Sequence, residues 1–212
     1  MNEQARKQIE ELLAIIDDGG GRGVRLLDDA QRLWQRVCHF LKLGLIRPEA
    51  DVEALELGCY ALQLPYRSGR AMPVGRFGQV SLRDRAEQAA ELLISLLGSF
   101  IDESLLDRTT RLLHELPQKS PVLDESKLLA DAVNLDDFGL VGFIRQAMQL
   151  ANQGLGVTQV AEGWEKRQQY GYWDARLKDG FHFEPVRQIA RRRLANLASA
   201  AQMLLDELRE EK

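Results

Sequence analysis

The stretch DDAQRLWQRVCHFLKLG, which runs from Asp28 to Gly44, carries the pattern that decides the fold. Its large apolar side chains recur every three or four residues, which places Leu33, Val37 and Phe40 on one side of a helix. A strand would instead alternate apolar and polar residues, because its successive side chains point to opposite faces. Gly44 follows the pattern and supplies the backbone freedom that ends a helix. The stretch therefore predicts an amphipathic α-helix.

The same spacing continues along most of the chain. Seven further helices are expected, over residues 9–16, 48–62, 82–97, 102–116, 125–132, 137–152 and 185–208. Ser81 stands before the third of these, with Asp84 three residues on, which is the pattern of a helix N-cap. Residues 64–80 are rich in glycine and proline and predict a loop, whereas the aromatic-rich residues 155–179 fit no single pattern.

The composition agrees with a single globular domain. The 212 residues are 45% hydrophobic and 28% charged, which is close to the globular average. We therefore predict an all-α fold, a single compact bundle over residues 1–212. An N-terminal helix and glycine-rich turn occupy residues 1–24 of it, and the core occupies residues 25–210.

Charge and hydropathy narrow the range of partners. The formal net charge is −4, whereas nucleic-acid-binding domains usually carry a basic surplus, so no nucleic-acid partner is expected. No apolar run approaches the ~20 residues needed to span a membrane, and residues 1–16 do not have the pattern of a signal peptide. Cys38 and Cys59 are expected to be free thiols. The expected location is the cytoplasm, with no membrane contact.

The second half of the chain holds a motif that resembles a known family. Residues 131–145 read DAVNLDDFGLVGFIR. This is similar to a stretch of the HD superfamily of metal-dependent phosphohydrolases, in which Asp-Ala-Asp-Arg-Leu-Asp precedes two spaced glycines and an arginine. His114 and Glu125 stand before the motif, and residues 177–193 follow it, in the family's order. The chain resembles the small single-domain bacterial members over residues 25–210, which implies an HD-like helical bundle.

The resemblance also implies four metal-binding positions, and only one of them holds a metal-binding side chain here. Leu33 stands where a histidine would precede the retained Arg36, and Leu62 and Gln63 stand at the His-Asp pair that names the family. Asp131 remains at the fourth position. Leucine donates no electron pair to a metal and glutamine offers only a neutral oxygen, so no metal or other cofactor is expected. No catalytic residue is assigned.

Three features keep alternative interpretations open. Asp131 is either a relict ligand or a helix-end carboxylate that pairs with a nearby arginine such as Arg36. The arginines that stand among glycines in residues 64–80 either cradle a phosphate or lie on a solvated loop. The candidate ligand pocket consists of Asp29, Arg36, Arg67, Arg70, Arg76 and His114. The aromatic residues Trp164, Tyr170, Tyr172 and Trp173 either stack a base or form a small core or dimer contact.

These features support three hypotheses for the function. The first is a catalytically degenerate HD-like protein, a non-hydrolytic scaffold that binds a partner or a small phosphorylated ligand. The second is a metal-dependent phosphohydrolase that acts on a nucleotide or another phosphomonoester, with a rebuilt site for a divalent metal such as Mn, Fe or Ni. The third is a homodimer-forming structural protein whose last helix supplies the interface. The missing ligands favour the first.

Overall fold

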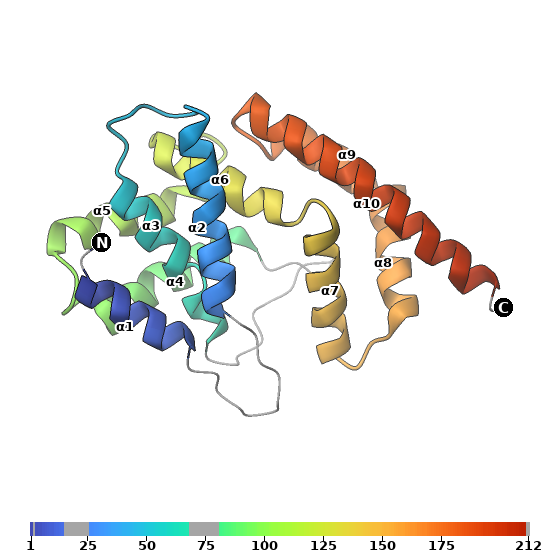
Figure 1. Cartoon of the computed structure of the whole chain (residues 1–212), viewed down its shortest axis with the longest axis horizontal. Helices are drawn as coiled ribbons and strands as arrows, with labels where there is room; N and C mark the ends of the chain where they lie inside the picture. The colour runs from blue at the N-terminus through green and yellow to red at the C-terminus, as the bar shows by residue number, and fades with distance from the viewer. Residues whose placement is uncertain (2, 15–25, 68–80, 211–212) are drawn as a thin grey trace. The chain divides into compact units, whose positions relative to one another are not determined.

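The computed structural model describes residues 1, 3–14, 26–67 and 81–210, and every regular element within them is a helix (Figure 1). The prediction of an all-α fold is confirmed. The elements are α1 (Glu3–Ala14), α2 (Leu26–Lys42), α3 (Val52–Ala61), the short 3-10 helix η1 (Leu64–Tyr66), α4 (Leu82–Leu97), α5 (Glu103–Glu115), α6 (Asp124–Asp136), α7 (Leu140–Asn152), α8 (Val157–Gln169), α9 (Tyr172–Asp179) and α10 (Glu184–Glu210). No helix in the described part of the chain is long and apolar enough to cross a membrane.

The chain forms two compact units. Among the described residues, the first unit comprises those up to Ala130 and the second comprises those from Asp131 onward. The single domain over residues 1–212 stays a prediction. The glycine-rich turn expected within residues 1–24 lies outside the described residues.

Helix α3 is the centre of the first unit. Its residues 54–61 are all buried, because α2, α4 and α5 pack around it. Gly58 permits a close approach: a Cβ at this position would lie 3.2 Å from Leu129 of α6 and 3.4 Å from Leu112 of α5. Ser81 caps α4 by accepting a hydrogen bond from the N–H of Asp84, as the sequence predicts.

An aromatic cluster forms the core of the second unit. The rings of Trp164 in α8 and Trp173 in α9 lie 5.8 Å apart, and Trp173 also packs edge-on against Phe138 at 5.2 Å. Both tryptophans are buried, whereas Tyr170 is exposed. Trp164 and Trp173 are therefore core residues. Helices α8 and α9 occupy the region that fitted no single sequence pattern, and α10 packs along α7, α8 and α9.

Candidate functional site

Helix α2 carries three of the candidate residues on one side. Asp29, Leu33 and Arg36 follow one another at spacings of four and three residues, which aligns them along the helix. Leu33 is buried, with 4% of its surface exposed. Asp29 accepts a hydrogen bond from Arg32 at 2.7 Å. This side of α2 therefore presents a buried apolar residue between two half-buried charged ones.

The end of α3 holds Leu62 and Gln63, which are both buried. The N–H of Leu62 donates to the carbonyl of Gly58, and its own carbonyl accepts from Arg85 Nε of α4 at 2.9 Å. The guanidinium of Arg85 also lies 5.1 Å from the centre of the Tyr66 ring. Leu62 is thus a core residue that ends α3, and α4 holds the backbone at this point.

The remaining pocket candidates come from other segments. Arg67 is half-buried and directly follows η1. His114 is exposed in the last turn of α5. Arg70 and Arg76 lie outside the described residues. The structure therefore places Arg67 and His114 on different elements of the first unit, along with Asp29 and Arg36 on α2.

The residue after His114 has a role that sequence reasoning missed. Glu115 is buried, and its Oε2 accepts hydrogen bonds from the backbone N–H groups of Val122 at 2.9 Å and Leu123 at 2.8 Å. Its other oxygen accepts from Arg111 Nε at 3.3 Å. Leu123 is the residue before α6, and its hydrocarbon side chain cannot cap the helix. Glu115 therefore supplies the acceptor that the start of α6 lacks.

Asp131 also binds two successive backbone N–H groups, in the second unit, but with one oxygen for each. It is fully buried, and its two oxygens accept hydrogen bonds from the backbone N–H groups of His182 at 2.8 Å and Phe183 at 2.9 Å. Phe183 is the residue before α10 and cannot cap it. Asp131, on α6, is thus the helix-end carboxylate of α10. The partners that hold both of its oxygens are backbone amides rather than the arginine expected from the sequence.

The electrostatics of Asp131 reflect two opposing influences. Burial raises the pKa of its carboxyl to about 7, while the N–H groups of His182 and Phe183 and the charge of Arg187 act in the opposite direction. Burial disfavours the charged form, and amide donors favour it. Burial is the larger influence, so this carboxyl ionises at a higher pH than a solvent-exposed aspartate does.

The other charged residues of the motif at 131–145 also make contacts within the second unit. Arg176 of α9 donates a hydrogen bond to Asp137 at 2.6 Å. Arg145, the arginine that ends the motif, pairs with Asp136. Arg176 also donates to Asn134 of α6 at 2.8 Å, so these contacts join α6 and the turn after it to α7 and α9, and the motif has a structural role in this chain.

The four positions where the resemblance implies metal ligands do not fit a divalent transition ion. Leu33 and Leu62 are buried hydrocarbon, Gln63 offers a neutral amide, and both oxygens of Asp131 accept backbone hydrogen bonds. Transition ions are bound by imidazole, thiolate and carboxylate groups, usually three or more of them. Within residues 1, 3–14, 26–67 and 81–210, no three His, Cys, Asp or Glu side chains lie where they could hold a metal ion.

Comparison with known proteins gives a likeness of fold. The sequence matches no protein-family model and is similar to no curated protein. Two solved structures are similar, both of Bacillus subtilis YpgQ, one in complex with ADP and one in its selenomethionine form. Each has a TM-score of 0.61 and 17% sequence identity, and the match covers 96% of this chain and 97% or 95% of the YpgQ chain. At this identity the likeness shows a shared all-α fold.

Proposed function

We propose that the protein is a catalytically degenerate member of the HD superfamily, a helical scaffold that binds a nucleotide or another small phosphorylated ligand without hydrolysing it. The observation that carries the proposal is the burial of Leu33 and Leu62, at positions where the resemblance implies metal-binding histidines. A metal there would lower the pKa of a water molecule and balance the charge of a phosphate. Buried hydrocarbon does neither.

The contacts of Asp131 support the loss of hydrolysis. Turning this carboxylate toward a metal would withdraw its oxygens from the N–H groups of His182 and Phe183. Each buried N–H that loses its acceptor costs about 1–3 kcal/mol. A single carboxylate with no histidine partners gains too little from a metal to offset that loss. The side chain therefore acts as a cap for α10.

The proposed class of ligand follows from the likeness to YpgQ, which was solved with ADP and matches over nearly the whole of both chains. A scaffold without a metal needs cationic side chains to bind phosphate oxygens, and the planar guanidinium of arginine matches them with paired hydrogen bonds. Arg36 on α2 and Arg67 after η1 are the described candidates, and Arg70 and Arg76 lie outside the described residues.

Calorimetric titration of ADP into the protein, once with EDTA and once with MnCl₂, tests the proposal. We expect equal affinity in both buffers and no hydrolysis of ADP by chromatography. Arg36→Ala and Arg67→Ala should each weaken binding. Arg47→Ala, which removes an exposed arginine from the segment between α2 and α3, is the matched control and should bind as the wild type does. Failure of ADP to bind would contradict a nucleoside diphosphate as the ligand.

Elemental mass spectrometry tests the loss of the metal site separately. Protein from cells supplied with Mn, Fe, Ni and Zn should carry well under one metal ion per chain. Near-stoichiometric metal, together with hydrolysis of a nucleotide or another phosphomonoester that Asp131→Asn abolishes, would establish an active phosphohydrolase with a rebuilt site. That result would overturn the degenerate scaffold.

A further inference from the structure

Helix α7, the loop after it and the first residue of α8 expose large apolar side chains. The six side chains are between 41% and 59% exposed. They are Leu140, Val141, Ile144, Met148, Leu155 and Val157, and together we call them the α7 face. The four on α7 lie within an arc of about 100°, because each residue turns a helix by about 100°. They therefore form one continuous stripe.

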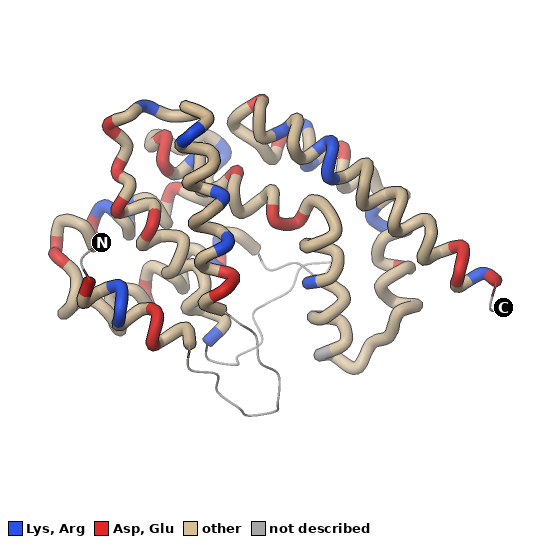
Figure 2. Tube along the Cα trace, viewed as in Figure 1, with Lys and Arg blue, Asp and Glu red and all other residues tan. Residues whose placement is uncertain are grey.

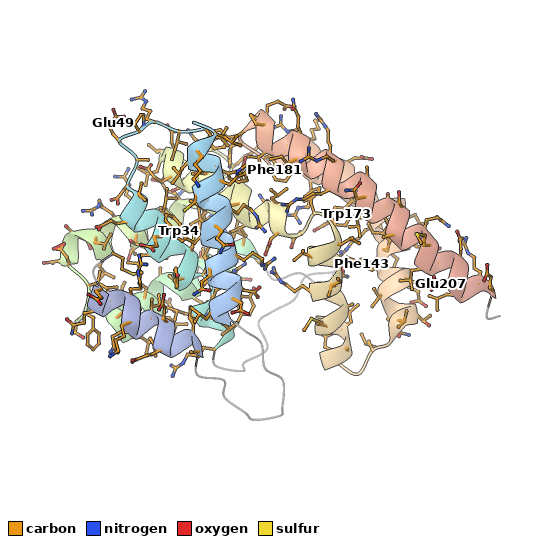
Figure 3. The ribbon with its side chains drawn as sticks, in the orientation of Figure 1. Trp34, Glu49, Phe143, Trp173, Phe181 and Glu207 are labelled. Carbon is orange, nitrogen blue, oxygen red and sulfur yellow. The ribbon has the colours of Figure 1, made fainter. Side chains whose placement is uncertain are left out.

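Another side of α7 is already packed. Helix α7 contacts α8 and α10, and the ring of Phe143, labelled in Figure 3, lies 6.5 Å from that of Trp164. A helix that is apolar on several sides is normally buried on several sides. The α7 face is therefore suited to being covered by another apolar surface.

The α7 face carries almost no charge, which limits what can cover it. Between Phe138 and Ala161 the sequence has one charged residue, Arg145, and this arginine pairs with Asp136. Figure 2 accordingly shows little charge along α7. Nucleic acid would meet no cationic surface here, and a helix that lies on a membrane usually carries a polar face rich in lysine and arginine. The surface that fits is an uncharged apolar protein face.

A second copy of this chain presents such a face. The other exposed large apolar side chains among the described residues lie singly on different segments; they are Leu43, Val52, Ile94, Val122, Tyr170 and Met203. The described surface that matches the α7 face is therefore the α7 face itself. An uncharged patch is complementary to itself across a two-fold axis, the commonest symmetry of soluble oligomers. We propose that the protein forms a two-fold dimer through the α7 face.

The size of the face sets the expected strength of this dimer. The largest apolar patch of a typical monomer measures about 300–600 Å² and is often functional, while specific interfaces bury about 1,000 Å² or more in total. Six half-exposed side chains on each copy place the dimer near that lower limit. It therefore dissociates on dilution, and its test needs a series of concentrations. This interface differs from the last helix, which the sequence suggested.

Sedimentation velocity of the full chain over a range of concentrations tests the proposal. The apparent mass of the wild type should rise from that of one chain, 24.0 kDa, toward twice that value as the concentration increases. Ile144→Lys combined with Met148→Lys places like charges opposite each other, which should raise the dissociation constant about 100-fold or more. Ile94→Lys, at a singly exposed apolar residue of α4, should dimerise normally.

Two outcomes would overturn the proposal in this experiment. One is a wild type that stays monomeric at the highest concentration. The other is a dimer that persists in the double lysine variant. Circular dichroism of that variant provides a further check, because loss of helical structure would show that its own chain covers the α7 face.

A mixing experiment tests the two-fold arrangement directly. Ile144→Lys and Ile144→Glu should each be monomeric alone, because the apolar interface would bury the new charge on each copy without an opposite partner. An equimolar mixture should form a mixed dimer, because opposite charges then face each other. A mixture that remains monomeric, although both variants are folded, would rule out pairing through this side of α7.

Discussion

Replacing Asp131 with alanine removes the acceptor of two backbone N–H groups, those of His182 and Phe183. Each buried donor left unsatisfied costs about 1–3 kcal/mol, so the two together amount to about 2–6 kcal/mol. Part of this is offset because the buried carboxyl no longer has to be held away from water. We therefore expect the free energy of unfolding of the second unit to fall by about 2–4 kcal/mol at pH 7.

Asp131→Asn separates the contributions of the two hydrogen bonds. The amide keeps the shape of the side chain and one carbonyl oxygen, so one N–H keeps its acceptor while the other faces an NH₂ group. The expected loss is about half that of alanine, about 1–2 kcal/mol. Asp179→Ala removes an exposed carboxylate from α9 in the same unit and should change the stability by less than about 0.5 kcal/mol.

Urea unfolding followed by tryptophan fluorescence measures these differences. In a Trp34→Phe background the two remaining tryptophans, Trp164 and Trp173, both report on the core of the second unit. An idle remnant of a ligand set would behave in the opposite way, because its removal would relieve a buried charge and raise stability. An Asp131→Ala variant as stable as the wild type, or more stable, would therefore refute the capping role.

Three further predictions follow from the same contacts. The contribution of Asp131 to the stability of the wild type should fall as the pH rises from about 4 to about 7. The carboxyl has a pKa of about 7 in the folded protein and 3.8 in the unfolded chain, so over this range only the folded protein keeps the proton. Melting temperatures of Asp131→Asn measured against pH should lack this fall. Glu115→Ala should lower the free energy of unfolding of the first unit, measured with urea, by about 2–4 kcal/mol, since the N–H groups of Val122 and Leu123 lose their acceptor. Glu91→Ala, on the exposed surface of α4, should leave it unchanged. Gly58→Ala should lower the free energy of unfolding of the first unit by about 1–3 kcal/mol, because the added methyl group overpacks against Leu129. Gly163→Ala, where the nearest side-chain atom is 3.6 Å from the new Cβ, should leave the melting temperature unchanged or raise it.

Local sequence signals account for most of the helices. The spacing of Leu33, Val37 and Phe40 identified α2 because all three are buried on one side of it. Ser81 identified the start of α4 because a cap acts over only three residues. Helices α8 and α9 were missed because tryptophans and tyrosines obscure their spacing, and because Gly171 separates them with a left-handed φ of 61°.

A helix-end carboxylate was one of the two interpretations of Asp131, but its backbone partners and the role of Glu115 were beyond local reasoning. Glu115 acts seven and eight residues away, and Asp131 acts more than fifty residues away. A weaker signal was nevertheless present. The helices that start after Leu123 and Phe183 have no capping side chain of their own, so each needed an acceptor from elsewhere. A lone carboxylate in an apolar segment, such as Asp131 between Ala130 and Ala132, is a good candidate for that acceptor.

Under the proposed HD ancestry, the capping role of Asp131 explains why one of the four implied metal positions holds a carboxylate. A ligand with no other role can become apolar once the metal is gone, because hydrocarbon then fills the space without leaving polar groups unpaired. Leu33 and Leu62 fit that description, since both lie in the core of the first unit. Asp131 cannot be replaced so readily, because α10 depends on its two oxygens. The carboxylate that remains is therefore evidence of a structural role and not, by itself, of catalysis.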